Sequence, residues 1–346
     1  MPVTSEERYL DLLKQILTRS LFDGGLVAYE PPRDAPERPL WEALRDHSPP
    51  GVELVRRQPH DPEARAVGRD WPADAETMIG LRRLDNIQAC LLAAAREGVP
   101  GDVLEAGVWR GGASILMRAV LAVYAITDRC VWVADSFEGL PPPDPARYPA
   151  DAGDRHWTQA ELVASLEDVR ANFARYGLLD EQVRFLPGWF DETLASAPID
   201  QLAVLRLDGD MYGSTIVALR SLYPKVAPGG FVIVDDYGAI EGCRQAVDDF
   251  CAEQGLTPEL HRIDWTGVYW RKQGPGGASP AARDELQQRL DAVYDSATWK
   301  AGAALLWLPK KLRDAIGALM RAVPGSHPPG EHDPDGSGED LRVQDR

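Results

Sequence analysis

Two segments near the start of the chain carry hydrophobic residues at helical spacing. Between Glu6 and Phe22 the apolar residues stand at positions 10, 12, 13, 16, 17 and 21, which predicts a helix. Residues 73–97 show the same periodicity, and Gly98 directly after them predicts the end of a second helix. From Pro31 to Pro72 the chain is rich in proline, arginine and aspartate and has little periodicity. We therefore expect a long irregular stretch there, which acts either as a functional lid or as a mobile connector.

Strand and helix patterns alternate over the next part of the chain. Short apolar runs predict five strands, at 102–107, 130–135, 182–186, 202–207 and 231–234. Helical patterns lie between and after them, at 114–125, 158–176, 214–222 and 243–254. This alternation predicts a doubly wound, Rossmann-like α/β sheet of five parallel strands. Residues 260–263 and 267–271 flank a tight turn and predict a closing antiparallel hairpin, which distinguishes the methyltransferase form of this sheet from the nicotinamide-binding form.

The composition changes after Lys272. Residues 273–280 are rich in glycine and proline and predict a linker, followed by an amphipathic helical tail up to residue 323. In that tail the apolar run 301–308 is followed by a basic cluster, so the tail could lie on a membrane surface, contact a partner helix, or pack on its own domain or a second subunit. Residues 324–346 are predicted to be disordered.

Composition and charge narrow the class of protein. The chain has 346 residues, of which 44% are hydrophobic, and a formal net charge of −17. The hydrophobic fraction excludes a wholly disordered protein, and no run approaches the ~20 apolar residues of a membrane helix. The acidic surface argues against a nucleic-acid partner. Four scattered cysteines and the lack of a signal-peptide pattern lead us to expect a cytoplasmic protein without a disulfide scaffold or zinc site.

A glycine-rich turn follows the first predicted strand. Its pattern is Glu105-x-Gly107-x-x-x-Gly111-Gly112, and a helix begins near Ser114. The spacing differs from that of the G-x-G-x-x-G motif of dinucleotide enzymes. Glycines let the backbone approach a ligand closely, and an acidic residue before them suits a ligand with an ammonium group, such as S-adenosylmethionine. The alternative is a tight strand-to-helix turn without a ligand.

Acidic residues end three further predicted strands. Asp135 could accept hydrogen bonds from ribose hydroxyls, or it could cap a turn with Ser136. Asp208-Gly-Asp210 and Asp235-Asp236 follow the fourth and fifth strands.

Because parallel strands run ~4.8 Å apart and end at one edge of the sheet, Asp208 and Asp235 can converge on one ion. Carboxylates without histidine or cysteine suit Mg²⁺ or Ca²⁺. The alternative is that they are ordinary polar strand ends, with Asp210 and Asp236 capping helices. His156 is a weaker candidate for a base, because a lone histidine is more often a surface or core residue.

The chain resembles the macrocin O-methyltransferase family from about Glu6 to Arg271. The stretches that carry the resemblance include ETMIGLRRLDNIQ, VLEAGVWRGGASILMRAVL, VWVADSFEGLP, LAVLRLDGDMYGST and LYPKVAPGGFVIVDDYG. The resemblance implies a class I S-adenosylmethionine-dependent methyltransferase sheet, residues 81–272, with an N-terminal helical lid, residues 1–80. It also implies methylation of a sugar hydroxyl with the help of Mg²⁺.

The resemblance further implies roles for individual residues. Asp208, Asp235 and Asp236 look like the metal ligands, and Asp208 like the base. Catechol O-methyltransferases carry a lysine three residues after the first acid, where this chain has Met211, so a lysine base is not expected. The cofactor contacts implied by position are Thr77, Met78, Glu105, Gly107, Ser114, Asp135, Ser136, Gly188, Trp189 and Phe190.

The sequence thus predicts an S-adenosylmethionine- and Mg²⁺-dependent O-methyltransferase that acts on a sugar in an antibiotic-type glycoside or a surface glycan. The alternatives are a nicotinamide-dependent oxidoreductase on a similar sheet and a non-enzymatic scaffold. We expect a homo-oligomer, a small-molecule or glycan acceptor, and possible contact of the tail with a membrane or a partner.

Overall fold

The computed structural model describes residues 3–22, 26–57 and 61–274. Residues 1–280 form one compact unit, and a second unit, 281–346, lies outside the described residues. The predictions of a tail helix over residues up to 323 and of disorder beyond it fall on that part of the chain.

A seven-stranded sheet forms the centre of the fold. Its strand order is β5-β4-β3-β6-β7-β9-β8, in which neighbouring strands are hydrogen-bonded. The first five of these run parallel, and β9 pairs antiparallel with both β7 and β8. The predicted fold class, including the closing hairpin, is therefore confirmed. The bounds are β3 Asp102–Ala106, β4 Val131–Asp135, β5 Val183–Pro187, β6 Leu202–Leu207, β7 Val226–Val234, β8 His261–Arg262 and β9 Val268–Arg271.

The strand order reverses beside β3. From β3 the chain proceeds outward through β4 to β5, and then returns to the other side of β3 to add β6 and β7. In open α/β sheets the loops on either side of such a reversal separate, which leaves a crevice at the carboxyl ends of the strands. The central strand β6 is buried along its whole length, as expected for a strand covered on both faces.

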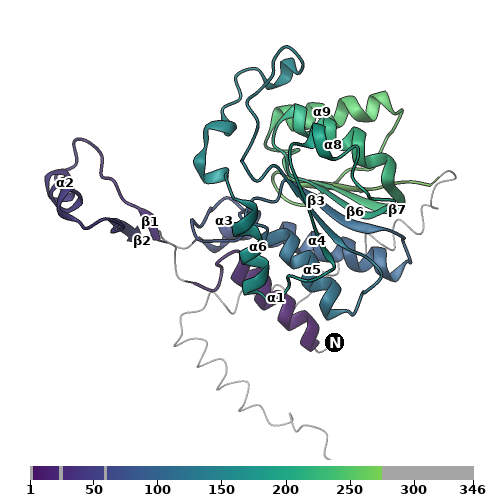
Figure 1. Ribbon diagram of the computed structural model, residues 1–346, viewed down its shortest axis with the longest axis horizontal. Helices are drawn as coiled ribbons and strands as arrows, with labels where there is room; N and C mark the ends of the chain where they lie inside the picture. The colour runs from purple at the N-terminus through teal and green to yellow at the C-terminus, as the bar shows by residue number, and fades with distance from the viewer. Residues whose placement is uncertain (1–2, 23–25, 58–60, 275–346) are drawn as a thin grey trace, which may run out of the picture. The chain divides into compact units, whose positions relative to one another are not determined.

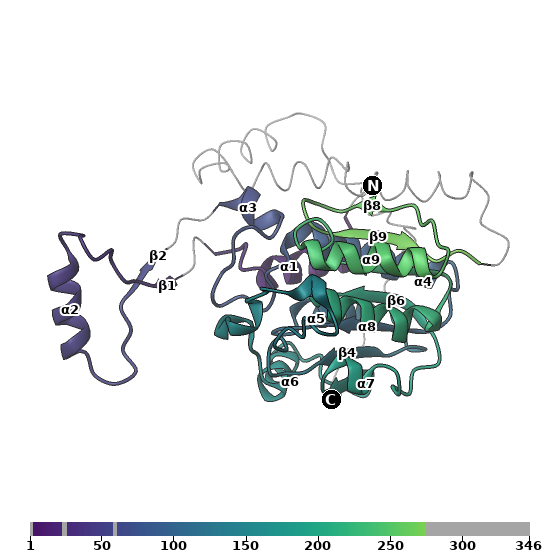
Figure 2. The same ribbon diagram turned by 90° about the horizontal axis from the view of Figure 1, so that it is seen from above.

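Helices cover both faces of the sheet (Figure 1). On one face lie α1 (Ser5–Leu17), α4 (Gly80–Arg96), α5 (Gly112–Val123) and α6 (Leu166–Arg175). On the other lie α8 (Tyr212–Leu222) and α9 (Glu241–Glu253), as the view from above also shows (Figure 2). The short helix α7 (Phe190–Thr193) contacts α8. Among the described residues, no helix combines the length and the apolar character that crossing a membrane requires.

Three predicted helices have an end that differs by five or more residues in the structure. Helix α4 begins at Gly80 and not at residue 73, because Gly80 has φ +81° and packs against the backbone of Gly68. Helix α6 begins at Leu166 and not at 158, where the Ser165 hydroxyl accepts a hydrogen bond from the Asp168 N–H at 3.1 Å. Helix α1 ends at Leu17 and not near 22, since the next residues leave the helical conformation.

The prediction of an irregular stretch from Pro31 to Pro72 is wrong in part. The structure has helix α2 (Arg38–His47), an antiparallel pair of β1 (Leu26–Ala28) with β2 (Val55–Arg57), and helix α3 (Pro62–Ala66). No residue of α2 is buried, yet Leu40, Trp41 and Leu44 stand at helical spacing, so the sequence carried a signal for this helix that the prediction overlooked. Local contacts hold it instead: Arg38 pairs with Glu42 at 2.9 Å and lies over the Trp41 ring.

Truncating Leu10 of α1 tests whether this helix is part of the core. Leu10 is fully buried, whereas Leu12 on the same helix is 48% exposed. We expect Leu10→Ala to lower the free energy of unfolding by ~2–5 kcal/mol, because it leaves a cavity, and Leu12→Ala to change it by no more than about 0.5 kcal/mol. Urea unfolding of both variants measures this, and equal losses would contradict the docking of α1 on α4 and α5.

Candidate active site

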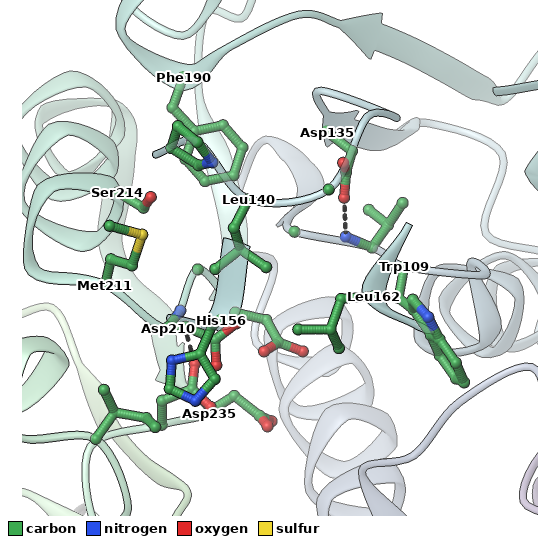
Figure 3. A pocket seen from close by; sticks show the side chains of 18 of the residues that line it. Trp109, Asp135, Leu140, His156, Leu162, Phe190, Asp210, Met211, Ser214 and Asp235 are labelled. Carbon is green, nitrogen blue, oxygen red and sulfur yellow. Dashed lines mark hydrogen bonds between the residues drawn. The ribbon is translucent and has the colours of Figure 1, made fainter. Parts of the chain in front are cut away.

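A cavity of about 730 Å³ opens at the carboxyl ends of the central strands (Figure 3). Its volume is in the range of small-molecule sites, and its position is the crevice expected from the strand order. Most of the predicted site residues line it: Thr77, Met78, Glu105, Gly107, Asp135, Ser136, Trp189, Phe190, Asp208, Asp235 and Asp236.

Two predicted cofactor contacts, Ser114 and Gly188, do not belong to the lining. Ser114 is fully buried in the first turn of α5, and its hydroxyl donates a hydrogen bond to the Glu105 carboxylate. The N–H of Gly188 donates to the carbonyl of Asp135 at 2.9 Å. Each of the two residues therefore forms a hydrogen bond with a residue that does line the cavity, Glu105 or Asp135. Their direct contact with a cofactor stays a prediction.

Gly107 brings two strand ends into close contact. Its φ is +87°, and a Cβ at this position would lie 1.7 Å from the carbonyl oxygen of Asp208. Only glycine fits such an approach without displacing the backbone. The turn after β3 is therefore tight, as the alternative interpretation required, and it also forms part of the cavity wall.

Asp135 at the end of β4 organises the same turn. Its Oδ2 accepts from the N–H of Val108 at 2.7 Å (Figure 3). Its Oδ1 accepts from the N–H of Phe137 at 2.8 Å. Burial raises the pKa of this carboxyl, and the backbone hydrogen bonds counteract part of that rise. Asp135 thus caps the turn that follows β4, as one of the two interpretations of the sequence expected. Asp135 also lines the cavity, and contact with a ribose remains a prediction.

The three acids predicted to hold a metal lie together at the base of the cavity. Asp208, Asp235 and Asp236 each contribute a carboxylate oxygen, and these oxygens lie within 4.8 Å of one another. Strand register explains this: Leu207 of β6 is the partner of Val234 of β7, so the residues that follow them emerge side by side. We call these three residues the acid centre.

An arginine missed by the sequence analysis lies beneath the acid centre. Arg206 is fully buried in β6, where its register partner on β3 is Glu105. Its guanidinium donates to Glu105 Oε1 at 2.5 Å, to Asp208 Oδ2 at 2.9 Å and to the carboxylate of Asp235. An arginine inside the apolar run LAVLRL was the available signal, because a buried guanidinium requires acidic partners.

Comparison with known proteins decides the family. The family model described as Macrocin-O-methyltransferase (TylF) matches residues 6–272. The chain belongs to the macrocin O-methyltransferase family. The resemblance found in the sequence is thereby confirmed, and the protein is an O-methyltransferase by family and fold.

Individual proteins are similar to this family member over most of the chain. An 8-demethyl-8-(2,3-dimethoxy-alpha-L-rhamnosyl)-tetracenomycin-C 4'-O-methyltransferase of Streptomyces olivaceus is 48% identical over 272 residues, 78% of this chain and 95% of that protein. Mycinamicin III 3''-O-methyltransferase of Micromonospora griseorubida is 45% identical over 275 residues, 78% of this chain and 98% of that protein. The solved structure of the O-methyltransferase NovP is 44% identical, covers 78% of this chain and all of its own, and has a TM-score of 0.67.

In this macrocin O-methyltransferase family member, burial and mutual repulsion raise the pKa values of several acids in the cavity. Burial and the neighbouring Asp235 raise the pKa of Asp208 to about 6, and burial and Asp208 raise the pKa of Asp210 to about 7. Burial also raises the pKa of Glu105 to about 7 against the opposing effect of Arg206. Clustered carboxylates of this kind are stabilised by additional positive charge, so the centre is chemically suited to a cation.

Other lining residues come from the long segment between β4 and α6. His156 Nδ1 donates a hydrogen bond to Asp154 Oδ2 at 2.7 Å, and the histidine ring lies on the acidic side of the cavity (Figure 3). Asp151 accepts from the N–H groups of Tyr212 and Gly213 at 2.7 and 2.8 Å, which joins this segment to the start of α8. Sequence spacing could not reveal Asp151, because its partners lie about sixty residues further along the chain.

Replacing Gly107 by alanine tests the close approach of the β3 and β6 ends. We expect Gly107→Ala to lower the free energy of unfolding by roughly 1–3 kcal/mol more than Gly98→Ala does, because the new Cβ would overlap the Asp208 carbonyl. Gly98 is the matched control, since it also has positive φ, +66°, but open space around it. Chemical unfolding gives both values, and equal losses would show that the contact is absent.

Proposed function

We propose that the chain transfers a methyl group from S-adenosylmethionine to a sugar hydroxyl of a glycosylated natural product, with Mg²⁺ as cofactor. The observation that carries this proposal is the acid centre in a cavity that the Gly107 turn and Asp135 also line. The named relatives support the acceptor class, since one acts on a rhamnosyl tetracenomycin at a 4' oxygen and another on mycinamicin III at a 3'' oxygen.

The part of the cavity nearest the Gly107 turn suits the cofactor. Asp135 offers carboxylate oxygens beside this turn, and the aromatic rings of Trp189 and Phe190 line the cavity beyond the end of β5. Thr77 and Met78 reach it from the segment before α4, which supports a covering role for the N-terminal region as a proposed lid. When bound, S-adenosylmethionine would supply the methyl group: the acceptor oxygen would bond to the methyl carbon as the carbon–sulfur bond breaks, and S-adenosylhomocysteine would leave.

The acid centre suits a hard divalent cation. Within the described part of the chain, Asp208 Oδ1 and Asp236 Oδ1 have no hydrogen-bond donor, so each is free to bind an ion. Carboxylate oxygens are the donors that Mg²⁺ prefers. Asp208, Asp236 and Asp235 would hold it, and when bound it would lower the pKa of the acceptor hydroxyl and stabilise the alkoxide character that develops on its oxygen.

Two carboxylates are candidates to take the acceptor proton. Asp208 was the predicted base, but one of its oxygens already accepts from Arg206 and the other is a proposed metal ligand. Asp210 lines the same cavity, and within the described residues its carboxylate has no hydrogen-bond or ion-pair partner. We therefore propose that Asp208 mainly binds the cation and that Asp210 takes the proton while the acceptor oxygen forms its bond to carbon.

A mass-shift screen tests the proposed activity. Incubation of candidate glycosides with S-adenosylmethionine and Mg²⁺ should add one CH₂ unit to the acceptor, and fragmentation should place it on the sugar. EDTA should abolish the product until Mg²⁺ is restored. Full activity in EDTA would refute the metal role, and methylation of a polysaccharide but of no small glycoside would overturn the acceptor class.

A pair of isosteric variants separates the two aspartates. Asp208→Asn should weaken Mn²⁺ binding and abolish transfer, because it removes a ligand charge. Asp210→Asn should leave Mn²⁺ affinity close to that of the wild type and lower kcat by about 10²–10⁴. Calorimetric titration and single-turnover kinetics measure the two effects. Normal turnover in Asp210→Asn would return the base role to Asp208.

A further inference from the structure

Arg83 approaches the acid centre from helix α4. Its side chain is almost fully buried, and its Nη1 pairs with Asp235 Oδ2. The other oxygen of the same carboxylate, Oδ1, pairs with Arg206. Both oxygens of Asp235 are thus taken by guanidinium groups. This distinguishes Asp235 from Asp208 and Asp236, each of which keeps a free oxygen within the described residues.

Arg83 also contacts two segments outside the sheet. Its Nε lies 3.1 Å from Asp264 Oδ2, in the turn between β8 and β9, and its Nη2 donates to the carbonyl of Val67 at 3.5 Å. The other oxygen of Asp264 accepts from the N–H groups of Thr266 and Gly267 at 3.0 and 2.9 Å, so this carboxylate is held by its own turn. The positive charge of Arg83 is therefore shared between Asp235 and a fixed second acid.

This arrangement has a consequence for any cation at the centre. A guanidinium stays charged at all accessible pH values, so a divalent ion that uses Asp235 meets a permanent positive charge on the same carboxylate. The ion either shares the oxygen with Arg83 or displaces it. In both cases Arg83 repels the ion. This repulsion is strong because both groups are buried and water screens their charges only weakly.

We infer that Arg83 is a positioning residue that holds Asp235 in place and lowers the affinity of the acid centre for its divalent cation. This inference rests on the proposed function, because it needs a cation site at Asp208 and Asp236. Asp264 reduces the repulsion between Arg83 and the cation, because its carboxylate also pairs with the Arg83 guanidinium. Arg83 therefore lets the ion bind while keeping the buried Asp235 compensated when the ion is absent.

Mn²⁺ titration calorimetry on the full chain tests the inference. Arg83→Gln should lower the Mn²⁺ dissociation constant by at least about tenfold, because it removes the competing charge and leaves Asp235 Oδ2 without its partner. Arg83→Lys is the matched control, which keeps the charge and should stay within about threefold of the wild type. An affinity of Arg83→Gln equal to or weaker than that of the wild type would overturn the inference.

A second variant keeps the test decisive if Arg83→Gln does not fold. Asp264→Asn retains an oxygen for the Thr266 and Gly267 N–H groups but no longer shares the charge of Arg83. Mn²⁺ binding should then weaken several-fold, the opposite sign to Arg83→Gln. An unchanged or tighter affinity in Asp264→Asn contradicts the inference.

The wild type and Asp236→Asn separate this inference from the proposed function. The proposed site requires that the wild type binds Mn²⁺ and that Asp236→Asn weakens binding. If the wild type binds no Mn²⁺, or if Asp236→Asn binds it as well as the wild type, the proposed cation site itself fails, and the inference with it. If those two results hold and the Arg83 and Asp264 variants match the wild type, only the inference fails.

Discussion

The site depends on one buried guanidinium. Arg206 lies in the middle of the sheet without exposed surface, and it pairs with acids at the ends of three neighbouring strands: Glu105 on β3, Asp208 after β6 and Asp235 after β7. Glu105 and Asp235 are buried, and without the charge of Arg206 the three acids would repel one another uncompensated. Removing one partner of such a network typically costs several kcal/mol. Arg206 thus offsets the repulsion between the carboxylates at the base of the cavity, and its hydrogen bonds orient their oxygens.

The acid centre suits a cation because the negative charge at the base of the cavity exceeds the positive charge around it. The two buried arginines, Arg206 and Arg83, do not compensate all of the surrounding acids, and the pKa of Asp236 is raised well above its usual range by burial and by neighbouring carboxylates. An additional cation would relieve this repulsion. The Gly107 turn lies against the same strand end, so a methyl donor beside it and an acceptor on the acid centre would meet within one cavity.

The sequence was sufficient to predict features that depend on regular periodicity. Apolar runs predicted the parallel strands, and their common edge explains why the acids after Leu207 and Val234 meet. The sequence did not predict side-chain pairs whose two residues lie far apart along the chain. Arg206 and Glu105 are separated by 101 residues, and Arg83 and Asp235 by 152. Helix α2 was missed although Leu40, Trp41 and Leu44 stand at helical spacing, because the surrounding proline-rich stretch was interpreted as irregular. Ser114 does not line the cavity, because the first turn of α5 directs its hydroxyl at Glu105, and no spacing pattern in the sequence shows that contact.

The central claim is that a divalent cation binds between the acids at the end of β6 and β7, next to the methyl donor. The most direct measurement is an anomalous difference map from crystals grown with Mn²⁺ and S-adenosylhomocysteine. We expect a peak in contact with carboxylate oxygens of Asp208 and Asp236, and the nucleoside beside Asp135. A cofactor bound in that cavity with no anomalous peak at these acids, or a peak held by other residues, would contradict it.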